Sequence, residues 1–107
     1  MKRHWELDEL IDHFTFLPNE LSQLSNKTGA TRFGFAVLFK YFQYEAKFPA
    51  HKGEIPKEVL MFISKQLNLG TFLIDEYDWN GRTIKYHRAQ IREFFGFREA
   101  TREDTQN

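Results

Sequence analysis

The segment from Thr31 to Glu45 constrains the fold most, because it is apolar on nearly every side of a helix. Its polar interruptions are mainly Arg32, Lys40 and Gln43. A helix that is apolar all round has to be buried. We therefore expect it to form the central core element, surrounded by the rest of the chain. Aromatic residues make up 17% of the 107 residues, so this core should be rich in aromatic rings.

The N-terminal segment has the spacing of an amphipathic helix with an acidic face. We expect this helix to run from Trp5 to Phe14, because apolar residues recur there every three or four positions and acidic residues lie between them. The expected apolar face contains Trp5, Leu7, Leu10, Ile11 and Phe14.

Proline and glycine mark the ends of the next helices. Proline is favoured in the first turn of a helix and glycine just past its end. We expect a short helix that starts at Pro18 and ends near Lys27, before Gly29. A further helix should start at Pro56 and end with Gly70 as a left-handed C-cap.

The C-terminal half should contain a brief helix or turn from Phe72 to Tyr77 and a last helix from Arg82 to Phe95, ended by Gly96. No segment alternates between apolar and polar residues for long, which argues against strands. The predicted fold is an all-α, compact bundle of about five to six helices with a helix-turn-helix-like C-terminal half. Residues 1–98 form the predicted domain, and residues 99–107 a polar tail or the start of a linker.

The last helix combines an apolar stripe with a basic stripe. Ile84, His87, Ile91, Phe94 and Phe95 share one face. Between Gly81 and Arg98 five basic residues are offset by one acidic residue, a local excess of four positive charges in a chain of zero net charge. A helix, a short turn and a basic helix is the order that places a second helix in a DNA groove. An ordinary solvated face is the alternative, and pattern alone does not separate the two. The candidate DNA-binding residues are Arg82, Lys85, Arg88, Arg92 and Arg98.

Two smaller basic groups are weaker candidates. Lys27, Thr28 and Arg32, with Thr31, lie where the second and third helices meet and could hold a phosphate, although a capped helix start gives the same pattern. Lys2 and Arg3 resemble an N-terminal arm that enters a minor groove, although stray charges are common at chain ends.

Composition and motifs argue against several other functions. The chain lacks cysteine, and its four histidines include no pair at metal-ligand spacing on one face. We expect His87 to be a partly buried, hydrogen-bonded residue rather than a ligand or base. The sequence contains no serine elbow of the kind that presents a catalytic nucleophile, no glycine-rich phosphate loop, no secretory signal pattern and no run long enough to span a membrane. We therefore predict no catalytic residue, no cofactor, no metal, no membrane partner and no small-molecule substrate.

An ordered set of short motifs runs along the chain. The motifs are Phe14-Thr15, Pro18 to Leu21, RFGFAV at Arg32 to Val37, Phe48-Pro49, Ile55-Pro56, Gln66-Leu67, Tyr77, and GRT, HR, IR and GFR between Gly81 and Arg98. Together they resemble the N-terminal region of the Tn-three family of replicative, cointegrate-forming transposases, and the similarity covers roughly residues 6 to 98. Two departures affect helix ends: Leu17 replaces a common Ser or Thr cap, and Ala46 a common glycine.

The resemblance implies an N-terminal fragment of a much longer transposase of the DDE type, whose catalytic carboxylates belong to a downstream RNase H-like domain. It implies recognition of terminal inverted repeats, with double-stranded DNA and the downstream domains of the same transposase as partners. It also implies a cytoplasmic, nucleoid-associated location in a bacterium. The alternative function is a helical protein-interaction module for dimerisation or interdomain docking, through exposed aromatics such as Trp5 or Trp79.

Overall fold

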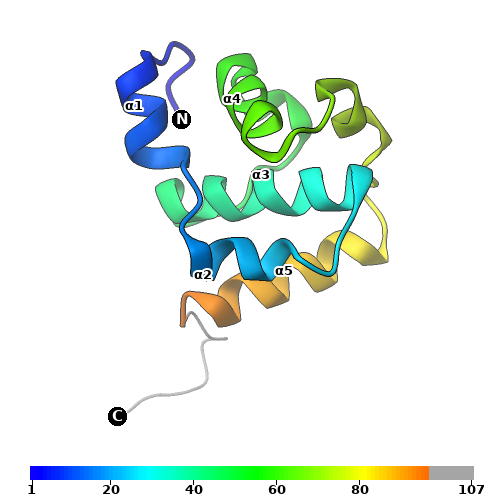
Figure 1. The fold of residues 1–107 in the computed structure, drawn as a ribbon. Coiled ribbons are helices and arrows are strands. Elements are labelled where there is room, and N and C mark those ends of the chain that lie inside the picture. The colour runs from blue at the N-terminus through cyan, green and yellow to red at the C-terminus, as the bar shows by residue number, and fades with distance from the viewer. Residues whose placement is uncertain (97–107) are drawn as a thin grey trace.

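The computed structural model describes residues 1–96, and all regular secondary structure within that range is helical (Figure 1). The predicted all-α bundle is confirmed. The predicted tail from residue 99 onward, and Arg98, lie outside the described residues. The α-helices are α1 (Leu7–Phe14), α2 (Pro18–Leu21), α3 (Gly29–Glu45), α4 (Lys57–Leu67) and α5 (Arg82–Phe94), and the short 3-10 helices are η1 (Ser22–Leu24), η2 (Lys52–Glu54) and η3 (Thr71–Glu76).

Helix α3 is the core of the molecule, as its apolar sequence predicts. Every residue from Phe33 to Phe42 is buried. Helices α1, α4 and α5 pack on it, together with η1 and η3. Figure 1 shows α3 crossing the middle of the fold, with α1 and α4 on one side of it and α2 and α5 on the other. The surrounding helices thus remove all sides of α3 from water, which is the main favourable contribution to folding.

The buried lysine of α3 is neutralised inside the protein. Lys40 Nζ lies 2.9 Å from Glu20 Oε1 of α2 and donates to the Thr15 carbonyl at 2.8 Å and to Gln43 Oε1 at 2.8 Å. Burial lowers the pKa of Lys40, and the Glu20 carboxylate opposes that shift. Burial would raise the pKa of Glu20, but hydrogen bonds from the Leu17 amide, Lys40 and Gln43 hold it below its usual value. This network ties α2 to α3.

A second polar contact holds the connection between α1 and α2. Gln66 of α4 donates to the Phe14 carbonyl at 2.9 Å and accepts from the Phe16 amide at 2.7 Å. Both backbone groups are therefore satisfied where α1 ends, as buried backbone groups require. The glutamine of the Gln66-Leu67 motif thus has a structural role.

Three helix ends differ from prediction. The expected single helix from Pro18 to Lys27 is two short elements, α2 and η1. Gly29 starts α3, with a φ of 56°, rather than ending the element before it. Asn68, with a φ of 58°, is the left-handed cap of α4, where Gly70 was predicted. Asparagine is one of the few residues besides glycine that adopts this conformation readily.

The predicted apolar face of α1 is only partly correct. Leu10 and Phe14 are buried, and Trp5 packs edge-on against Phe14 with ring centroids 5.0 Å apart. Leu7 is 65% exposed and Ile11 is 49% exposed. The reason is geometric, because α1 spans eight residues and buries one narrow side against α3 and α4. Leu7 and Ile11, one turn apart, lie beside that side.

A small cluster attaches the chain before α5 to the core. The ring of Tyr77 lies directly against Gly34 of α3, where an added Cβ would be 2.2 Å from the ring. Tyr77 Oη and His87 Nδ1 are 2.6 Å apart, and the His87 ring meets Phe35 edge-on at 5.0 Å. Burial, with a smaller effect of the Lys27 charge, lowers the pKa of His87 to about 4. The prediction of a buried, hydrogen-bonded His87 is confirmed.

Candidate nucleic-acid interface

Helix α5 lies with its predicted apolar face on α3. Ile84, His87 and Ile91 are buried, and Phe94 and Phe95 are partly buried against the core. The apolar side of α5 is therefore packed against the core, and the opposite side faces solvent. The exposed side chains of α5 are Arg82, Thr83, Lys85, Tyr86, Ala89 and Glu93.

The basic residues of α5 occupy one side of the helix. Arg82 and Lys85 are exposed, whereas Arg88 and Arg92 are half-buried beside them. With Glu93 as the one acidic residue, α5 carries a net charge of +3. Within residues 1–96, none of these four basic side chains forms an ion pair. We call Arg82, Lys85, Arg88 and Arg92 the α5 basic flank.

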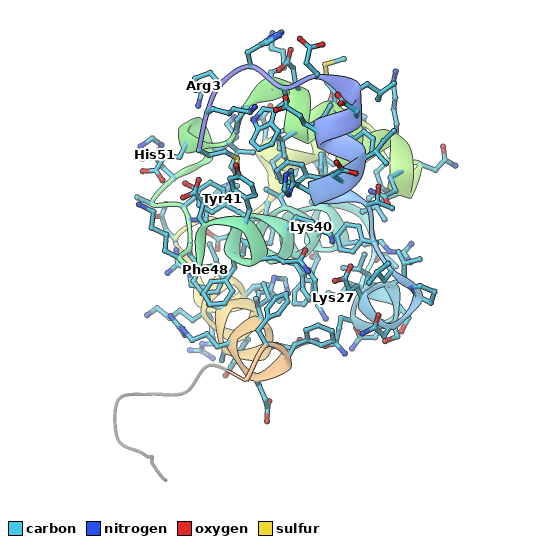
Figure 2. The ribbon with its side chains drawn as sticks, turned by 90° about the vertical axis from the view of Figure 1, so that its left-hand side faces the viewer. Arg3, Lys27, Lys40, Tyr41, Phe48 and His51 are labelled. Carbon is cyan, nitrogen blue, oxygen red and sulfur yellow. The ribbon has the colours of Figure 1, made fainter. Side chains whose placement is uncertain are left out.

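Phe48, in the connection between α3 and α4, supports half of this flank. The guanidinium carbons of Arg88 and Arg92 lie 5.8 and 5.1 Å from the centroid of its ring. The same ring stacks on Phe42 at 4.6 Å. Figure 2 shows Phe48 beside the α5 ribbon. The sequence indicates Phe48-Pro49 only as a helix end, since nothing in one sequence pairs Phe48 with arginines about forty positions away.

Lys27 is used inside the fold. The side chain is 8% exposed, and its Nζ donates to the Gln23 carbonyl at 3.1 Å, Asn26 Oδ1 at 3.1 Å and Gln90 Oε1 at 3.3 Å. It also lies 4.2 Å above the Phe35 ring, and burial lowers its pKa. The ammonium group therefore joins η1 to α5, and we do not include it in an interface.

Lys27 of this second cluster lies on the side of α5 opposite the α5 basic flank. Gln90, the partner of Lys27, is two positions from both Arg88 and Arg92, which places it on the opposite side of α5. Thr28 is exposed at the N-cap of α3, without a side-chain cap hydrogen bond. Arg32 is half-buried, and its Nε has no hydrogen-bond partner in the described part of the chain. Of the second cluster, Lys27 is thus separated from the α5 basic flank.

The N-terminal basic residues contact the domain itself. Arg3 Nη1 donates to the Gly53 carbonyl at 3.2 Å. Lys2 pairs with Glu9, and its Nζ lies 4.8 Å above the Trp5 ring. In this conformation neither residue extends from the fold as a free arm.

A groove at the C-terminal end of α1 has a cavity volume of about 680 Å³. Its lining includes the exposed apolar side chains Ile11, Leu17 and Tyr44, with Lys40 and Glu20 also contributing. A smaller hollow of about 300 Å³ on the α4 side of α1 includes Leu7 and Met61. Trp5 is 3% exposed, which corrects the expectation that it forms an exposed aromatic patch, and Trp79 is half-buried.

Residues 1–96 hold neither of two other kinds of site. No three histidine, aspartate or glutamate side chains gather there as a metal site. None of the described helices is long and apolar enough to span a bilayer.

The fold and its surface define a small all-α module whose helix α5 carries a net charge of +3. The chain belongs to the DUF4158 family, a domain of unknown function, whose model matches residues 1–107. It is 30% identical over 95 residues to the transposase for transposon Tn3926 of Escherichia coli, covering 88% of this chain and 10% of that protein. It is 31% identical over 96 residues to the transposase for transposon Tn21 of Escherichia coli, with the same coverage.

The transposase for transposon Tn501 of Pseudomonas aeruginosa is 29% identical over 88 residues, which is 81% of this chain and 9% of that protein. The chain thus spans about a tenth of the length of these curated relatives, and it matches their N-terminal region. The predicted resemblance to the Tn-three family is confirmed. No solved structure matches the chain.

Proposed function

We propose that this domain binds double-stranded DNA through α5 and, within a transposase, recognises the terminal inverted repeats of its transposon. The observation that carries the proposal is the α5 basic flank, which lies on a helix of net positive charge and has no ion-pair partner among residues 1–96. Unpaired cations on one helix side attract phosphate at long range. The similarity to transposases is the reason for proposing terminal inverted repeats as the DNA that is recognised. The catalytic step would belong to other parts of such a transposase.

Arg82 and Lys85 provide the direct test, because both are exposed and their removal leaves the core intact. Fluorescence anisotropy of residues 1–107 should be measured against a terminal-repeat duplex and a scrambled duplex across a salt series. We expect the Arg82→Ala, Lys85→Ala variant to bind DNA more weakly than the parent, because two exposed cations of the α5 basic flank are lost.

Lys57 and Lys65 offer a matched control. Both are exposed on α4, which makes no direct contact with α5 in the described structure. The Lys57→Ala, Lys65→Ala variant has the same net charge as the α5 variant, so any difference between them reports position rather than charge. Equal affinity of the two variants for DNA would contradict the assignment of α5 as the interface.

A second candidate function is protein interaction through the surface around α1. The observation that favours it is the group of exposed apolar side chains beside the two hollows there. Exposed apolar groups that gather in this way are typical of interaction sites. Sedimentation of the chain at increasing concentration tests self-association: a rising mass, abolished by Leu7→Ser with Ile11→Ser, would support this candidate.

A further inference from the structure

The guanidinium groups of Arg88 and Arg92 share one aromatic support. They lie one helical turn apart on α5, and both are within 6 Å of the Phe48 ring centroid. Phe48 is itself held in place by Phe42 behind it and by Pro49, which is fully buried. A guanidinium over a ring face is attracted to the ring and loses side-chain freedom. The two arginines are thereby held in position before any ligand arrives.

The positive charges of Arg88 and Arg92 are not balanced by an acidic side chain within residues 1–96. Two positive groups on one ring also repel each other. Arg88 Nε is buried and has no hydrogen-bond partner there. Guanidinium groups stacked on a ring keep their N–H edges free, and these edges match the oxygen spacing of a phosphate. A bound phosphodiester would offset the repulsion and accept hydrogen bonds from the solvent-facing N–H groups of the two guanidiniums, while the buried Arg88 Nε stays out of its reach.

The position of the pair on the helix separates it from the outward side chains. Arg88 and Arg92 are half-buried at the edge of α5, next to the α3–α4 connection, whereas Arg82, Lys85 and Tyr86 are exposed; Tyr86 is 67% exposed. When a helix lies in a major groove, its outward side faces the base edges and its edges face the sugar-phosphate backbone.

We propose that Arg88 and Arg92, positioned by Phe48, form a backbone-phosphate site, while Arg82, Lys85 and Tyr86 provide the contacts to bases. This inference rests on the proposed DNA-binding function and divides α5 into a part that holds the duplex and a part that reads it. Phe48 is a positioning residue here, because it acts through the two arginines.

The test compares two substitutions of Phe48 by the salt-series anisotropy assay. Phe48→Leu removes the ring, and we expect a loss of affinity of about threefold to tenfold that is equal for the terminal-repeat and scrambled duplexes. Phe48→Tyr retains a ring and should bind like the parent. Thermal unfolding of each variant identifies the temperature range in which both are folded, and binding is measured there.

A double-mutant cycle distinguishes positioning from a purely structural role. Arg92→Lys keeps the charge but loses the planar donor group, so it should weaken binding in the parent and have little further effect beside Phe48→Leu. Arg88→Ala with Arg92→Ala should lower the salt slope by about two without changing the preference for the repeat. Lys85→Ala should reduce that preference.

Each failure of the test has a distinct meaning. No DNA binding by the parent at low salt would overturn the proposed function and this inference together. DNA binding that is insensitive to Phe48→Leu, or additive losses in the cycle, would overturn the inference alone. A loss of repeat preference in the Arg88→Ala, Arg92→Ala variant would reassign those arginines to base contacts. Binding of a carboxylate-rich peptide in competition with DNA would identify a protein ligand instead.

Discussion

Helices α1 and α5 are both amphipathic and both pack on α3, yet they carry net charges of opposite sign. Helix α1 carries a net charge of −3 and α5 one of +3. Of the three acids of α1, Glu9 pairs with Lys2, whereas Asp8 and Asp12 have no ion-pair partner among residues 1–96. The cations of α5 have no such partners in the described part of the chain. A zero net charge therefore conceals an acidic surface and a basic surface, and only the basic surface on α5 offers unpaired cations to a phosphate.

The buried Lys40 gives the largest test of this comparison. Lys40→Met should lower the free energy of unfolding by about 3 to 5 kcal/mol, because it leaves the Glu20 carboxylate buried without its partner. Urea unfolding measures this loss. In conditions where the variant is folded, its DNA affinity should equal that of the parent.

The control for this substitution is Lys40→Met with Glu20→Gln, which removes both charges and should recover most of the loss. A DNA-binding defect in folded Lys40→Met would break the distinction between an internally paired cation and a ligand-binding one.

Lowering the pH should change the contributions of His87, in α5, and His4, near α1, to the stability of the fold in opposite directions. The pKa of His87 is lowered to about 4 by burial, so the unfolded chain binds a proton that the folded chain does not between pH 6.5 and about 4. The free energy of unfolding should therefore decrease as the pH is lowered through that window, by on the order of 3 kcal/mol in total. Urea unfolding at a series of pH values measures it, and His87→Gln should flatten the profile.

The exposed His4 near α1 provides the contrast. A hydrogen bond to Glu6, with the charge of Glu58, raises the pKa of His4. Its contribution is present below the unfolded pKa and is lost as pH rises through the folded value, which is the opposite sign. His4→Gln should leave the acid loss in place; its disappearance would contradict the assignment to His87.

Ala46 offers a smaller test that changes stability without charge. This residue caps α3 with a φ of 62°, a conformation that costs a residue with a Cβ about 1 kcal/mol relative to glycine. Ala46→Gly should stabilise the fold by up to that amount, measured by thermal unfolding. Because the α5 basic flank is unchanged, DNA affinity should stay the same. A higher affinity would mean that stability, rather than charge, limits binding.

The smallest expected effect comes from the acidic face of α1. Asp8→Asn with Asp12→Asn removes two negative charges from exposed positions remote from the α5 basic flank. Screening at physiological salt leaves little interaction over such a distance, so DNA affinity should rise by about twofold or less. A change as large as that of the Arg82→Ala, Lys85→Ala variant would show that net charge, not the arrangement on α5, determines binding.

Particular residues show how far the sequence predicts the structure. Spacing predicted α3 as the core and the face of α5 that contains Ile84, His87 and Ile91, because an apolar stripe has to be buried somewhere. The prediction that Leu7 and Ile11 belong to the buried face of α1 is wrong. The apolar spacing of a helix does not show how much of its surface the neighbouring helices cover. The left-handed cap of α4 was likewise predicted at Gly70 rather than at Asn68, since both residue types adopt that conformation.

The candidate site was only half predictable. The amino-acid order is enough to establish that α5 carries a basic stripe beside an apolar one, since helical periodicity is a local property of consecutive residues. Only the folded chain shows which cations remain unpaired. Lys27 donates hydrogen bonds to oxygens of η1 and α5, whereas Arg88 and Arg92 lie over the ring of Phe48. The reason is that pairing and burial depend on side chains brought together from distant parts of the chain, and their distances are set by the packing of α3 with its neighbours.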